Sequence, residues 1–128
     1  MNVSLEHANV TVSDPQKTAQ WLGQVFGWKI RWEGAAINGG YTIHVGNETS
    51  YLALYTPGDA AKDGHDNSYT VRGGLNHLAV VVDDLDGVED RVKAAGFATG
   101  NHGDYEPGRR FYFHDSDGIE FEVVSYAA

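Results

Sequence analysis

Two histidines and one glutamate are the residues whose types and spacing could do chemistry in this chain. His7 and His77 occupy equivalent positions of a repeated segment, because residues 5–14 return as residues 75–84 with Leu, His, Val, Val and Asp in register. Glu122 lies in the last apolar stretch of the chain. Two neutral imidazoles and one carboxylate suit a first-row divalent metal, and three protein ligands leave positions open for water and substrate, as in non-haem iron centres. The set predicts a divalent metal cofactor, with iron, manganese, zinc, nickel and cobalt as candidates.

The repeat also predicts the elements that must position these side chains. We expect a single domain, 1–128, of two modules at about 1–56 and 74–128, joined by a loop at 57–73. The expected strands are 3–12, 28–33, 40–46, 50–55, 75–82, 97–101, 109–114 and 119–125, and the expected helices are 15–25 and 85–95. Neither module has enough apolar surface to be stable alone. The sequence therefore predicts an α+β fold in which two βαβββ repeats form one curved mixed sheet around a concave cavity, with helices on the outer face.

Alternation along the strands indicates which face carries the site, because residues two apart point to the same side. Val10 and Val80 suit packing under the helices, which leaves His7 and His77 on the opposite face. The same reasoning adds further side chains to that face, namely Tyr51, Tyr55, Arg110, Tyr112 and Glu122. The pattern leaves open whether His44 faces the cavity. A polar and aromatic concave face is typical of a small-molecule site.

Composition excludes several classes of function. The formal net charge of −9 argues against nucleic acid or an anionic membrane as a partner. The absence of cysteine excludes disulfides, thiol catalysis and zinc–thiolate sites. The first strand begins close to Met1, and no apolar run approaches the roughly 18 residues of a membrane span, so we expect a cytoplasmic protein.

Residues 110–122, Arg-Phe-Tyr-Phe-His-Asp-Ser-Asp-Gly-Ile-Glu-Phe-Glu, carry a family resemblance. They resemble the aromatic strand, Asp-Pro-Asp-Gly turn and closing strand with a ligand Glu of the vicinal oxygen chelate superfamily, also called the glyoxalase/bleomycin-resistance/dioxygenase superfamily. The two histidine strands and the Gly-aromatic ends of both helices, Gly27-Trp28 and Gly96-Phe97, add to the likeness. The resemblance covers essentially the whole chain and implies a small two-module member and a homodimer. It does not set the reaction, because this scaffold hosts isomerisation, epimerisation, dioxygenation, thiol transfer and metal-free drug binding.

The resemblance carries the family's metal ligands onto His7, His77 and Glu122. Ser116 stands where the turn usually has Pro, a change that concerns turn rigidity. Ala53 aligns with the slot where four-ligand members such as glyoxalase I place Glu, Gln or His. An alanine cannot bind metal, so the resemblance favours a three-ligand centre as in the extradiol dioxygenases.

Two functions follow from the resemblance. In a metalloenzyme, of dioxygenase-like or lyase/isomerase-like chemistry, the metal would bind vicinal substrate oxygens. Tyr112 would donate a hydrogen bond to substrate, His102 resembles an acid–base histidine with its spacing off by one residue, and Arg110 could pair with a substrate carboxylate. In the alternative, a metal-free protein like the bleomycin-resistance members would use Tyr51, Tyr55 and Tyr112 to sequester a cationic aromatic ligand. Such members generally lack the metal ligands that are intact here.

Overall fold

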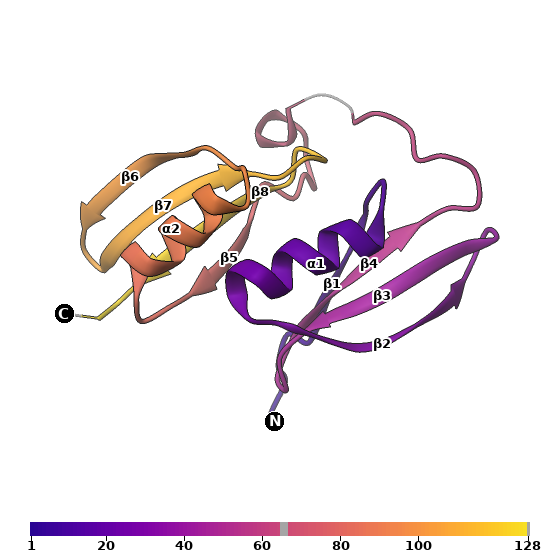
Figure 1. Cartoon of the computed structure of the whole chain (residues 1–128), viewed down its shortest axis with the longest axis horizontal. Coiled ribbons are helices and arrows are strands. Elements are labelled where there is room, and N and C mark those ends of the chain that lie inside the picture. The colour runs from indigo at the N-terminus through magenta and orange to yellow at the C-terminus, as the bar shows by residue number, and fades with distance from the viewer. Residues whose placement is uncertain (65–66, 128) are drawn as a thin grey trace. The chain divides into compact units, whose positions relative to one another are not determined.

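A computed structural model describes residues 1–64 and 67–127 of the chain. Two compact units, Met1–Asp63 and Gly64–Ala128, are described separately below. His65 and Asp66, within the expected loop 57–73, lie outside the described residues, as does Ala128. Each unit holds one α-helix and a four-stranded mixed sheet in the order βαβββ (Figure 1). The predicted α+β fold of two βαβββ modules is confirmed, and the described strands form two four-stranded sheets where one curved sheet was expected.

Unit 1 has strand order β1-β4-β3-β2, with β1 parallel to β4 and the other pairs antiparallel. Its elements are β1 (His7–Thr11), α1 (Pro15–Phe26), β2 (Lys29–Ala36), β3 (Gly40–Gly46) and β4 (Tyr51–Thr56). Leu22 and Val25 of α1 are fully buried, as are Ile43 of β3 and Leu54 of β4. The helix thus covers one face of its sheet, and we call the opposite face the open face of unit 1.

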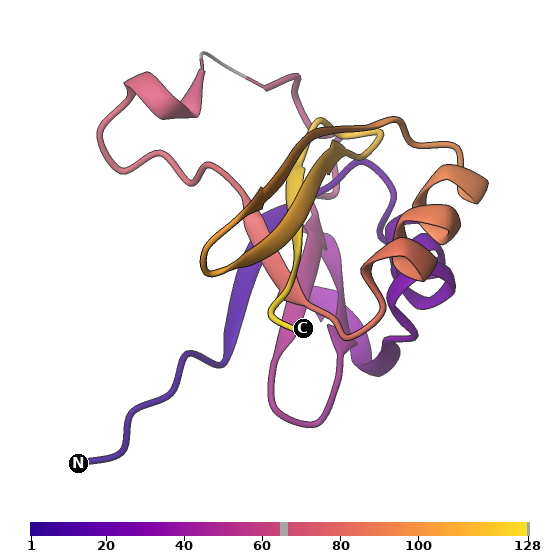
Figure 2. The same cartoon turned by 90° about the vertical axis from the view of Figure 1, so that its left-hand side faces the viewer.

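Unit 2 repeats this arrangement with strand order β5-β8-β7-β6. Its elements are η1, a 3₁₀ turn (Ser68–Thr70), β5 (Leu78–Val81), α2 (Leu85–Ala94), β6 (Thr99–Tyr105), β7 (Gly108–His114) and β8 (Glu120–Ser125). Val92 of α2 is fully buried with Phe111, Phe113 and Val123 of the sheet. Each helix lies on one face of its own sheet (Figure 2). The face of this sheet opposite α2 is called the open face of unit 2.

The repeated aspartates account for the start of both helices. Asp14 Oδ1 accepts a hydrogen bond from the backbone N–H of Lys17 at 3.3 Å, and Asp84 Oδ1 accepts one from Gly87 at 3.0 Å. Each carboxylate satisfies one of the N–H groups that a helix leaves free at its first turn. No helix among the described residues is long and apolar enough to cross a membrane.

Several elements differ from the expected ones. β1 begins at His7 and not at residue 3, and β6 runs over Thr99–Tyr105 and not over 97–101. β5 is shorter than the expected strand 75–82, so His77 directly precedes the strand, and Leu75 is exposed. The turn η1 falls in the segment expected to be a loop without structure. Asn67 caps this turn by accepting a hydrogen bond from Tyr69 N at 3.0 Å, a local contact that hydrophobic periodicity does not reveal.

Candidate metal and ligand site

Unit 2 brings together two of the three expected metal ligands. Glu122 lies on β8 opposite Ala79 of β5, and His77 stands two residues before Ala79, so the two side chains share the open face. His77 Nε2 lies 3.0 Å from Glu122 Oε1. The side chains are 30% and 10% exposed, so the imidazole is accessible while the carboxylate is largely buried.

The other nitrogen of His77 faces groups that hold the ring in place. Nδ1 lies 3.1 Å from the hydroxyl of Tyr69 and 3.5 Å from Glu120 Oε1. Tyr69 also donates a hydrogen bond to Glu120, and this contact raises the pKa of Tyr69 to about 12. A histidine ligand commonly has its second nitrogen held in this way, which fixes the direction of the first. Sequence reasoning missed Tyr69, because a single tyrosine in a loop gives no periodic signal.

The pair also passes a simple geometric test for a shared metal. Two ligands at about 2.1 Å from one ion and at right angles to each other lie about 3 Å apart. The 3.0 Å between His77 Nε2 and Glu122 Oε1 matches that spacing. Among the residues described, no three His, Asp or Glu side chains form a complete metal-binding group. Unit 2 by itself therefore offers a pair of ligands.

Arg110 is turned to Glu122. Its Nη1 donates to Glu122 Oε2 at 2.9 Å, and its guanidinium carbon lies 4.8 Å from the centre of the Tyr105 ring. Its Nε is buried and has no hydrogen-bond partner in the described part of the chain. The positive charge expected to meet a substrate carboxylate thus balances a carboxylate of the protein.

Tyr112 completes this cluster. It lies opposite Glu122 in the antiparallel register of β7 and β8, and its ring meets that of His77 edge-on at 5.6 Å between centroids. Burial raises the pKa of Tyr112, and the charge and hydrogen bond of Glu122 raise it further. The phenol stays protonated at neutral pH, and its single O–H is directed to Glu122. Its expected donation to a substrate oxygen stays a prediction.

His102 lies away from this cluster. Its Nε2 lies 2.7 Å from Glu89 Oε2 on α2, so its side chain is on the face that the helix covers. The cause is a β-bulge in β6, where Asn101 adopts a left-handed conformation with φ of 51°. Since a bulge adds a residue to one strand, it breaks the alternation that would have placed His102 on the face of Gly100 and Tyr112. The acid–base role expected for His102 stays a prediction.

In unit 1, His7 and the two expected tyrosines lie on the open face. The ring of His7 stacks on that of Tyr51 with 4.7 Å between centroids, and His7 Nδ1 lies 2.8 Å from Glu6 Oε1. Tyr55 lies further along β4, and its hydroxyl donates to Ile37 O at 3.0 Å. That bond ties Tyr55 to the β2–β3 turn, while Tyr51 is held by ring stacking.

Two further side chains reach Tyr51. His44 stacks on it with 4.6 Å between centroids, so this histidine does face the open side, where it pairs in register with Ala53. Arg31 lies with its guanidinium carbon 4.5 Å from the same ring centre. A bulge between Ile30 and Trp32 places Arg31 and Trp32 together on the open face, and no sequence signal marked it.

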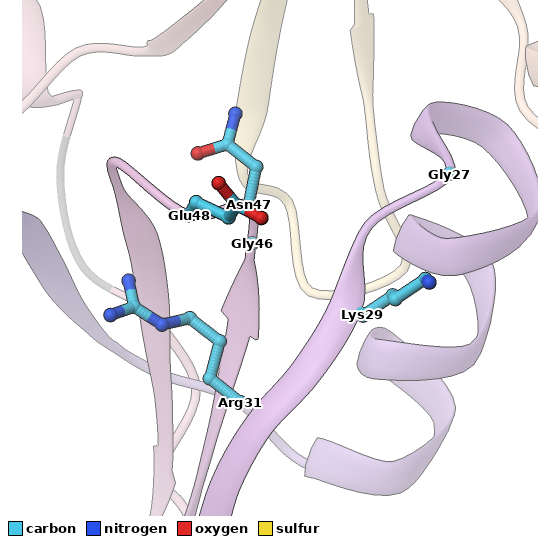
Figure 3. A pocket seen from close by; sticks show the side chains of 6 residues that line it. All are labelled: Gly27, Lys29, Arg31, Gly46, Asn47 and Glu48. Carbon is cyan, nitrogen blue, oxygen red and sulfur yellow. The ribbon is translucent and has the colours of Figure 1, made fainter.

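A cavity of about 530 Å³ opens next to this group. It lies where α1 ends, β2 begins and β3 turns into β4, and it is lined by Gly27, Lys29, Arg31, Gly46, Asn47 and Glu48. The side chains of Lys29 and Arg31 point in different directions (Figure 3). Arg31 alone belongs to both the cavity and the group around Tyr51.

Known structures share this fold. A glyoxylase/bleomycin resistance protein/dioxygenase domain from Frankia sp. EAN1pec superposes with a TM-score of 0.82 at 24% identity, covering 98% of this chain and 93% of that one. The fosfomycin resistance protein FosX from Listeria monocytogenes, complexed with Mn(II) and sulfate, gives 0.73 at 20% identity over 98% and 93%. A FosX mutant from the same organism with Mn(II) and 1S,2S-dihydroxypropylphosphonic acid gives 0.72 at 20% identity over 100% and 93%.

Sequence comparison gives the family. No curated protein matches the chain. The family model of the Glyoxalase/Bleomycin resistance protein/Dioxygenase superfamily matches residues 4–123, nearly the whole length. This match agrees with the two βαβββ modules and with the resemblance of residues 110–122. The chain therefore belongs to the glyoxalase/bleomycin resistance protein/dioxygenase superfamily.

Proposed function

We propose that this chain is a metal-dependent enzyme whose ligands are His7, His77 and Glu122, and whose substrate is a small molecule with two vicinal oxygens. The observation that carries the proposal is the 3.0 Å approach of His77 Nε2 to Glu122 Oε1. Nδ1 of the same ring is turned to Tyr69 and away from the ligand position. His7 is the ligand that the family resemblance adds, and its own variant tests it separately.

When bound, the metal would act as a Lewis acid that polarises the substrate oxygens. The protein's part is to bind and orient. Tyr112 keeps its proton because its pKa is raised, and on substrate binding it would exchange its hydrogen bond with Glu122 for one to a substrate oxygen. Tyr69 fixes the direction of His77, and Arg110 fixes that of Glu122. The substrate contact expected for Arg110 stays a prediction.

Chemistry of the dioxygenase kind and of the lyase or isomerase kind both fit this ligand set. Ala53 in the slot of a fourth ligand favours a three-ligand centre. Since two FosX neighbours hold Mn(II), manganese is the first metal to test. The homodimer and the cytoplasmic location expected from the sequence stay predictions.

A second candidate is a metal-free protein that sequesters a small ligand. One observation favours it: Arg110 Nη1 lies 2.9 Å from Glu122 Oε2 and supplies the positive charge that a metal would otherwise bring to this carboxylate. In such a protein the Arg110–Glu122 pair would be a permanent ion pair, and the tyrosines of the open faces would contact the ligand.

Elemental analysis of protein purified without chelator or an affinity-column metal separates the two. The full chain is compared with His77→Ala and His7→Ala, and His102→Ala serves as a control because that ring faces α2. The proposal expects close to one metal per chain, before or after anaerobic loading with Mn(II), lost in both ligand variants and kept in the control.

The resident metal then guides the assays. Iron or manganese leads to catechol substrates under oxygen, and zinc or nickel leads to lyase and isomerase assays. If the natural chain and His77→Ala are equally free of metal after loading, the enzyme proposal is refuted and ligand-binding screens follow.

A further inference from the structure

The open face of unit 1 carries two polar groups that the protein leaves without polar partners. The imidazole of His44 and the guanidinium of Arg31 both lie against the ring of Tyr51, at 4.6 Å and 4.5 Å from its centre. Among the described residues, His44 makes no hydrogen bond and Arg31 forms no ion pair at contact distance, although it acts electrostatically on the exposed carboxylate of Glu6. Both groups are therefore available to a ligand.

An unpaired arginine is notable in this chain. Lys and Arg number 9 against 18 Asp and Glu, so acidic side chains are abundant. In the described part of the chain, ion pairs with carboxylates are formed by Arg109, Arg110 and Lys93, and none is formed by Arg31. Its guanidinium is held on Tyr51 and also lines the 530 Å³ cavity (Figure 3), so an external anion can reach it. A planar guanidinium suits two oxygens of one anion.

A third polar side chain of this face, Thr42, is shielded from solvent. It lies two residues before His44 on β3 and thus shares its face. The residue is 8% exposed, and its Oγ1 is buried without a hydrogen-bond partner in the described part of the chain. Because this oxygen is inaccessible, a ligand on the open face finds its polar contacts at Arg31 and His44.

We propose that Arg31 and His44 form a subsite for an oxyanion, so that the substrate is an anionic small molecule such as a carboxylate, phosphonate or sulfate ester. This inference deepens the proposed function and rests on it, because it names the chemical class of that enzyme's substrate. His7 stacks on the same Tyr51 ring, and an anion held here lies in the same unit as that proposed metal ligand.

The charge state of His44 adds a pH dependence. Burial lowers the pKa of His44, and electrostatic interactions with His7 from β1 and Arg31 from β2 lower it further, against an opposite effect of Glu6. The ring is therefore neutral at pH 7, and its neighbour on β4, Tyr51, is uncharged there. An oxyanion at the subsite favours the imidazolium, so its binding takes up a proton and tightens as the pH falls.

Sulfate is the probe, because its charge is constant between about pH 5 and 8. Its binding to the full chain is measured by calorimetry and by histidine-ring NMR, with and without diamagnetic Zn(II). The variants are Arg31→Gln and His44→Gln. Arg109→Gln and His102→Gln are matched controls, since those side chains pair with Asp86 and Glu89 in unit 2.

We expect saturable sulfate binding that weakens at least about tenfold in each variant, as for loss of a charged hydrogen bond. The controls should bind as the natural chain does. Binding should tighten from pH 7.5 to 5.5, and His44→Gln should remove this dependence. If Arg31→Gln does not fold, Arg31→Lys is used, which keeps the charge and loses the planar fork.

Three results would overturn the subsite: no saturable binding to the natural chain, equal binding in variants and controls, or binding that requires Zn(II) and ignores both variants. The outcome for the subsite does not decide the outcome for the proposed function. If the chain holds no metal but binds sulfate through Arg31 and His44, the enzyme proposal falls and the subsite remains. If the chain holds a metal but binds no sulfate, the enzyme proposal stands and the subsite proposal falls.

Discussion

Replacing Arg110 by methionine should destabilise the metal-free protein and leave the metal-loaded protein nearly unaffected. Methionine keeps the apolar stem of the side chain and removes the guanidinium, which lies over the ring of Tyr105. Glu122, whose side chain is 10% exposed, would then keep His77 and the uncharged Tyr112 as its partners. A bound divalent metal would replace the lost positive charge.

The magnitude follows from the burial of the pair. Removing one partner of a fully buried ion pair costs about 3–5 kcal/mol. Arg110 and Glu122 retain 13% and 10% exposure and His77 remains nearby, so we expect a loss of about 2–3 kcal/mol in metal-free protein. For a chain of 128 residues that loss lowers the melting temperature by roughly 6–15 °C. With Mn(II) in excess, the loss should fall below about 1 kcal/mol, because binding to the folded state adds stability.

Urea denaturation of the full chain, with EDTA and with Mn(II), measures both losses. Arg109→Met is the matched control, because its pair with Asp86 is exposed and should contribute less than about 1 kcal/mol under either condition. The double variant Arg110→Met with Glu122→Gln should regain part of the stability in EDTA, since it leaves no buried charge. Equal losses with and without metal would refute the reasoning, because the metal would then not meet Glu122.

Three shorter predictions concern unit 2. Tyr69→Phe should weaken metal binding about 10-fold, as is usual when the group that orients a histidine ligand is lost, and unchanged affinity in a metal titration would exclude that role. His102→Ala should keep full metal content and full activity in the assays above, and a tenfold loss of activity would restore its acid–base role. Burial acts to raise the pKa of Glu89, but hydrogen bonds from Thr99 and His102 outweigh it and leave the pKa below its usual 4.5. The stability that this lowered pKa contributes is present above pH 4.5 and is lost as the pH falls through the lowered value. Thr99→Val should therefore reduce the loss of stability between pH 5 and 3, measured by urea denaturation.

Strand alternation predicted most of the fold and part of the candidate site. It placed Tyr112 and Glu122 on one face of neighbouring strands, because a regular antiparallel ladder preserves the two-residue period. It could not give the surroundings of His102 or of Arg31, because each lies at a bulge, where one added residue interrupts that period. The sequence could not reveal the role of Tyr69 for a different reason, because its contact with Glu120 joins residues far apart in the chain.

The two bulges have a consequence for solubility. β2 and β6 are the last strands of their sheets, and each pairs with a neighbour on one side only within its own sheet. A straight outer strand offers a row of free N–H and C=O groups to another chain and promotes aggregation. The irregular backbone at Arg31 and at Asn101 shortens that regular row and twists it. Removing Asn101 to straighten β6 should therefore make the protein more prone to assemble through its sheet edge at high concentration.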